Sequence, residues 1–133
     1  MSAVEPASGP VVLVVDDEPV VLSLMQRALT QAGYQVYAAR DGLSALALAA
    51  KLPSPPVALV TDLRMEPIDG ASLCRLVRQV YPGIHVVFVS GFGPPTEYGE
   101  LPGPLLRKPF APDALIGTLG DVLRPLQGTN SSS

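Results

Sequence analysis

The chain has a single cysteine, no long hydrophobic run and no surplus of positive charge among its 133 residues. The lone Cys74 excludes an intramolecular disulfide and suits a reducing compartment; we interpret it as a small apolar residue on a helix. No apolar run approaches the roughly 18 residues that a membrane span needs. Residues 1–10 lack the basic and apolar regions of a secretory signal. We therefore expect a soluble, cytoplasmic protein without membrane insertion.

A formal net charge of −3 gives no clustered basic face, so we expect no nucleic-acid partner. The hydrophobic fraction of 47% and mean hydropathy of +0.33 indicate a folded globule rather than a disordered chain. The length fits one domain. We expect a flexible tail over residues 1–10, a folded domain over 11–126 and a disordered tail over 127–133.

Short β-rich, mostly apolar runs alternate with amphipathic segments along the chain. The runs predict strands at 11–15, 34–39, 57–62, 84–90 and 105–106. Helical periodicity predicts helices at 21–32, 43–51, 70–81 and from 112 onward. Such alternation is typical of an α/β fold with a parallel sheet and helices on both faces.

The polar residues that follow these strands point to chemistry at one edge of the sheet. Because parallel strands end together, we expect five side chains to converge there: Asp16, Asp17, Asp62, Ser90 and Lys108. Carboxylates alone would repel one another, whereas Mg²⁺ (or Mn²⁺) accepts oxygen ligands of this kind. With a hydroxyl and an ammonium added, the set can bind a phosphoryl group, and a carboxylate can accept one as an aspartyl phosphate.

At these residues the chain resembles the receiver domain of the bacterial response-regulator family. The resemblance covers roughly residues 10–126 and rests on four motifs: Asp16-Asp17-Glu18-Pro19, Asp62 with Met65 and Asp69-Gly70 downstream, Ser90-Gly91, and Lys108-Pro109-Phe110. It implies a flavodoxin-like, doubly wound sheet of five strands in the order 2-1-3-4-5.

The resemblance also implies a role for each matching residue. Asp62 is the expected phospho-acceptor, and Asp17 the direct Mg²⁺ ligand. Asp16 is expected to hold the metal through water or as a second ligand, and Asp62 and the backbone carbonyl of Arg64 complete the expected metal site. The remaining expectations are a switch hydroxyl at Ser90, a phosphate-binding ammonium at Lys108 before a cis peptide bond, and, at Gly91, a small residue that lets a phosphodonor approach.

Two departures from the family pattern concern the output of the signal. Leu105 occupies a position that is usually aromatic and that couples movement of the hydroxyl to the outer surface. The segment 91–104 is short and rich in Gly and Pro, so we expect the family's fourth helix to be missing or very short. Glu66 stands where proline is commonest, with Pro67 one place later, and we draw nothing from this shift.

We expect a stand-alone receiver in a two-component phosphorelay. It would take phosphate from a histidine kinase or phosphotransfer protein and signal through contact with a downstream protein, without being an enzyme. One alternative is a degenerate receiver that binds its partner independently of phosphorylation. Another is an aspartyl-phosphate phosphohydrolase, which is disfavoured because Arg64 stands where such enzymes carry a second acid. We interpret His85 as structural and Tyr98 as a loop residue.

Overall fold

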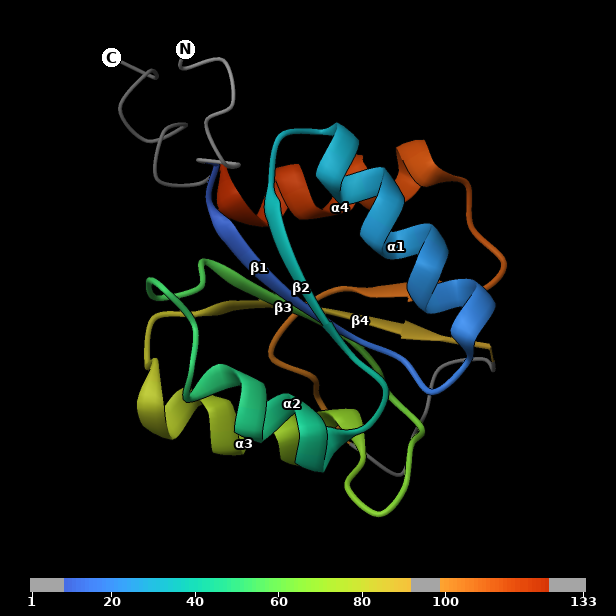
Figure 1. Ribbon diagram of the computed structural model, residues 1–133. Coiled ribbons are helices and arrows are strands. Elements are labelled where there is room, and N and C mark those ends of the chain that lie inside the picture. The colour runs from blue at the N-terminus through green and yellow to red at the C-terminus, as the bar shows by residue number, and fades with distance from the viewer. Residues whose placement is uncertain (1–8, 92–98, 125–133) are drawn as a thin grey trace, which may run out of the picture.

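The computed structural model describes residues 9–91 and 99–124. In this part of the chain, parallel strands form one sheet in the order β2-β1-β3-β4-β5. The strands are β1 (Val11–Val15), β2 (Gln35–Ala39), β3 (Ala58–Asp62), β4 (His85–Ser90) and β5 (Leu105–Arg107). The helices are α1 (Pro19–Gln31), α2 (Gly42–Ala49), α3 (Gly70–Val80) and α4 (Pro112–Leu123). Helices α1 and α4 cover one face of the sheet and α2 and α3 the other (Figure 1), which confirms the predicted fold class.

The central strands are mostly apolar, with polar residues only at or next to their ends, because both faces of the sheet are buried. In β1, Leu13 and Val15 belong to the core beneath α2 and α3, whereas Val12 and Val14 belong to the core beneath α1 and α4. Side chains alternate between faces along a strand, so a sheet covered on both sides needs an uninterrupted apolar run. The same alternation holds in β4, where Phe88 and its neighbours are fully buried.

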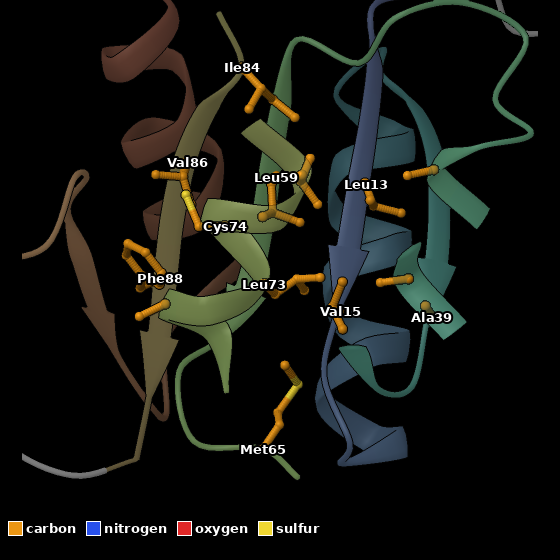
Figure 2. Close-up of a cluster of buried hydrophobic side chains, with 14 of the residues drawn as sticks. Leu13, Val15, Ala39, Leu59, Met65, Leu73, Cys74, Ile84, Val86 and Phe88 are labelled. Carbon is orange, nitrogen blue, oxygen red and sulfur yellow. The ribbon is translucent and has the colours of Figure 1, made fainter. Parts of the chain in front are cut away.

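Figure 2 shows the core under α2 and α3. Leu73 and Cys74 of α3 lie over the sheet and belong to the same core as Val86 of β4. Met65, from the loop after β3, closes this core near the carboxyl ends of the strands. Cys74 is 1% exposed and unpaired, and burial raises the pKa of its thiol. Its interpretation as a small apolar core residue is therefore confirmed.

The predicted elements are present, with ends displaced by one or two residues. Helix α1 begins at Pro19 rather than at residue 21, since proline needs no hydrogen-bond partner in the first turn of a helix. Helix α2 ends at Ala49 rather than at residue 51. At the starts of α2 and α3, Asp41 and Asp69 each accept a backbone hydrogen bond at 2.7 Å, from Ser44 and Ser72. These caps satisfy amides that the helix leaves unpaired.

Between β4 and β5, the described residues 99–104 form no helix. Residues 92–98, including Tyr98, lie outside the described residues. The described part of this connection packs directly on β4: the amide of Phe88 donates to the Pro104 carbonyl at 2.9 Å, and Leu101 joins the core. A β-carbon on Gly103 would collide with the carbonyl oxygen of Val86, so glycine is required for this close approach.

Most of the two predicted tails lies outside the described residues. Pro10 is described, and its carbonyl accepts a hydrogen bond from the Gln35 amide at 2.8 Å, next to the start of β1. Among the described residues, no helix has the length and apolar character needed to cross a bilayer.

Candidate functional site

The predicted site residues lie together at the carboxyl edge of the sheet. Asp16 directly follows β1, Asp62 and Ser90 are the last residues of β3 and β4, and Lys108 directly follows β5. Asp16, Asp62 and Ser90 are 0%, 4% and 1% exposed. Buried polar groups of this kind need partners, and the parallel register of the strands supplies them.

Backbone hydrogen bonds hold these strand ends in register. The Asp16 amide donates to the Ala39 carbonyl at 3.2 Å, and the Lys108 amide donates to the Ser90 carbonyl at 2.8 Å. The start of α3 approaches β3 so closely that a β-carbon on Gly70 would collide with the carbonyl oxygen of Asp62. The glycine that follows Asp69 thus allows the helix to lie against the end of the strand that carries Asp62.

Asp16, Asp17 and Asp62 can each offer one carboxylate oxygen within 4.8 Å of the others. Asp17 is exposed, which leaves room for water ligands. Asp16 Oδ2 is buried without a hydrogen bond, although Lys108 Nζ lies 3.0 Å away as an ion-pair partner. Hard oxygen donors with open water positions suit Mg²⁺. The residues present therefore fit a bound Mg²⁺.

Lys108 is the cation of this cluster and has three carboxylate partners. Its Nζ lies 2.6 Å from Glu18 Oε1, 3.0 Å from Asp16 Oδ2 and 3.4 Å from Asp62 Oδ2. Sequence reasoning identified Asp16 and Asp62 as neighbours of Lys108 but missed Glu18. Its position beside the Asp16-Asp17 pair was the only signal, and that position says nothing about where the side chain points.

Burial and mutual repulsion shape the ionisation of the acids. Burial, together with the charge of Asp16, raises the pKa of Asp62 to about 6, and Lys108 opposes this rise. Burial also raises the pKa of Asp16, partly offset by the 2.8 Å hydrogen bond from the Glu18 amide and by Lys108. For Lys108, burial disfavours the charge, but Glu18, Asp16 and Asp62 outweigh it and raise the pKa. These shifts are typical of carboxylates that share one buried space.

The other predicted residues surround this cluster. The Arg64 amide donates to Asp62 Oδ1 at 3.4 Å, which places the backbone of Arg64 beside the acid. Gly91 is exposed, and a β-carbon there would meet open space. The Lys108–Pro109 peptide bond is cis, as the family resemblance implies, and Glu66–Pro67 is cis as well.

His85 is the first residue of β4 and so lies at the opposite end of the sheet.

Fold and site together define a class of protein: a doubly wound α/β domain with a carboxylate and lysine pocket at the carboxyl edge of its sheet. Comparison with known proteins specifies this class further. The model of the response regulator receiver domain family matches residues 12–119.

Individual proteins are similar over most of the chain. Sensor kinase CckA of Brucella abortus is 34% identical over 84% of this chain and 12% of its own length. Response regulator MprA of a Mycobacterium strain is 33% identical over 90% of this chain and 54% of its own. The structure of chemotaxis response regulator CheY4 of Vibrio cholerae is 28% identical, with a TM-score of 0.75 over 86% of this chain and 99% of that one.

The chain belongs to the response regulator receiver domain family. It is a receiver domain of two-component signalling. Receiver domains of response regulators interact with histidine kinases or phosphotransfer proteins. The chain spans about half the length, or less, of the curated relatives named above.

Proposed function

We propose that the chain accepts a phosphoryl group on Asp62 from a histidine kinase or phosphotransfer protein, and signals through contact with a downstream protein. The observation that carries the proposal is the convergence of Asp62 with Asp16, Asp17 and Lys108 in one pocket. Positioning and charge neutralisation are most of what phosphoryl transfer needs from a protein. The clustered carboxylates and the Lys108 ammonium support both positioning and charge neutralisation.

In the proposed step, a carboxylate oxygen of Asp62 attacks the phosphorus of a phosphohistidine. An O–P bond forms, the P–N bond breaks, and the electron pair stays on the imidazole nitrogen. Lys108 neutralises one phosphoryl oxygen, and the Ser90 hydroxyl donates a hydrogen bond to another. Gly91, which carries no side chain, leaves the donor room to approach.

Asp16, Asp17, Asp62 and the Arg64 carbonyl would hold Mg²⁺. The bound ion would supply positive charge against the carboxylates and the incoming phosphoryl oxygens. Asp17 is the exposed member of the three carboxylates. Burial, together with the charge of Asp16, raises the pKa of Asp62, and such a cation would offset the repulsion between the two carboxylates.

The proposal limits the chemistry to phosphorylation and dephosphorylation of the chain itself. An aspartyl-phosphate phosphohydrolase that turns over external substrate would carry a second acid two positions after the nucleophile, and Arg64 stands there. A degenerate receiver keeps one observation in its favour. The described residues 99–104 pack on β4 without a helix, which changes a surface that could otherwise report phosphorylation.

Phosphorylation by a small-molecule donor tests the proposal. Incubation with acetyl phosphate and Mg²⁺ should add one phosphoryl group, detected by mass spectrometry of the intact chain. Asp62→Asn should abolish the addition, and so should EDTA. Asp69→Asn is the matched control, because Asn also caps a helix and Asp69 is not one of the three clustered carboxylates Asp16, Asp17 and Asp62. If Asp62→Asn were phosphorylated as readily as the wild type, the proposal would be wrong.

A further inference from the structure

The shortest ion pair of Lys108 is with Glu18, an acid that has no role in the proposed chemistry. Glu18 Oε1 lies 2.6 Å from Nζ, closer than either Asp16 or Asp62. The side chain of Lys108 is 12% exposed, whereas that of Glu18 is 59% exposed. The pair therefore joins an ammonium inside the pocket to a carboxylate at its mouth.

The backbone keeps Glu18 at this mouth. The Glu18 amide donates to Asp16 Oδ1 at 2.8 Å, and the Glu18 carbonyl accepts a hydrogen bond from Leu22 at 2.9 Å, in the first turn of α1. The residue is thus tied to the acidic cluster on one side and to a helix on the other. Its side chain is exposed and is directed at Lys108.

A phosphoryl group on Asp62 would need the same ammonium. It brings roughly 1.5 to 2 negative charges and three strong acceptor oxygens. A lysine ammonium has three donors, but Asp16 and Glu18 already lie within 3.0 Å of it. Because Lys108 is the buried partner and Glu18 the exposed one, the carboxylate can leave for water while the ammonium stays.

We propose that Glu18 is an intrinsic competitor of the phosphoryl group for Lys108. It holds the ammonium in the unphosphorylated protein and releases it when the phosphoryl group arrives, so it lowers the affinity of the site for that group. Glu18 is a positioning residue that acts through Lys108. The inference rests on the proposed function and adds a residue that sets how readily the site is filled.

Binding of beryllofluoride, which mimics a phosphoryl group on an aspartate, tests the inference at saturating Mg²⁺. The dissociation constant, followed by NMR titration, should fall about two- to five-fold in Glu18→Gln, the size expected for losing a partly exposed ion pair. Glu66→Gln is the matched control. Glu66 is an exposed acid that lines a recess together with Asp17. Its substitution removes the same charge as Glu18→Gln, but Glu66 is not among the ion-pair partners of Lys108 in the described part of the chain.

Salt supplies a second measurement. Since Glu18 is largely exposed, high ionic strength should screen its pair with Lys108 and bring the dissociation constants of the wild type and Glu18→Gln together. A variant that only perturbed the loop would keep its difference at high salt and would also melt at a lower temperature. Glu18→Gln should melt close to the wild type.

Several outcomes would overturn the inference. Equal affinities of Glu18→Gln and Glu66→Gln for beryllofluoride would mean that general charge is the whole effect. Weaker binding by Glu18→Gln would instead mean that Glu18 orients Lys108 for the phosphoryl group. A wild type that fails to bind beryllofluoride is a different result, because it contradicts the proposed function itself.

Discussion

Asp62 is the residue whose charge the fold disfavours most clearly. It is 4% exposed, lies near two other carboxylates and has the Lys108 ammonium 3.4 Å away. Burial of a carboxylate beside like charges is costly in the absence of a metal ion. The burial of Asp62 should therefore lower the stability of the folded state, and this loss should be measurable.

Metal-free protein should become less stable as pH rises from 5 to 7. The pKa of Asp62 is raised from 3.8 to about 6, so the folded state binds more protons than the unfolded state in this window. The stabilising contribution is present at low pH and is lost as pH rises through the folded-state pKa, by on the order of 1 kcal/mol. Urea unfolding in EDTA measures it.

The same titration in Asp62→Asn should show a smaller loss of unfolding free energy, since the titrating carboxyl is gone. Asp16, whose pKa is also raised, accounts for the remainder. Asp69→Asn should follow the wild type. A loss of equal size in Asp62→Asn and the wild type would show that Asp62 does not titrate in this range.

At the scale of elements, the connection between β4 and β5 is the unusual one. Its described residues 99–104 seal the edge of the core with Leu101 and with the close approach of Gly103 to β4. Leu105 packs in the same core and has no polar tip to exchange with solvent. In α3, the Arg78 guanidinium donates to the carbonyl of Ile84, next to the start of β4, at 2.9 Å. This surface differs from one built around a fourth helix, so a downstream protein would meet a loop there.

Two glycine substitutions should move stability in opposite directions. Gly103→Ala places a β-carbon against the Val86 carbonyl and should destabilise by about 1–3 kcal/mol, the usual cost of overpacking. Gly117→Ala in α4 meets open space and should stabilise by about 1 kcal/mol through helix propensity. Thermal melts of the two variants measure both effects. A neutral Gly103→Ala would show that the loop does not pack on β4 as described.

At the scale of the whole molecule, a metal ion bound at the cluster of Asp16, Asp17 and Asp62 would link metal binding to global stability. A ligand that binds only the folded state stabilises it, by about 2.7 kcal/mol at a hundred-fold excess over its dissociation constant. Mg²⁺ should therefore raise the melting temperature, beyond the effect of NaCl at matched ionic strength. Asp17→Asn should lose most of this rise because it removes an exposed ligand oxygen, whereas Glu66→Gln should keep it. An unchanged rise in Asp17→Asn would place the ion elsewhere.

The fold class was predictable because its cause is local to each segment. Apolar runs such as Val11–Val15 indicate strands buried on both faces, and amphipathic segments between them require crossovers. The same logic brought Asp16, Asp62, Ser90 and Lys108 together, since parallel strands end at one edge. The roles assigned to these residues stay predictions until phosphorylation is measured.

Sequence alone thus determined the parallel sheet, the strand ends that carry polar groups and the expected oxygen ligands for a cation. Only the tertiary structure decided that Glu18 reaches Lys108, ninety positions along the chain, and that residues 99–104 pack on β4. The physical reason is the range of the interactions. Periodicity reports the burial of a segment, whereas the partner of a side chain depends on register, twist and packing among distant segments.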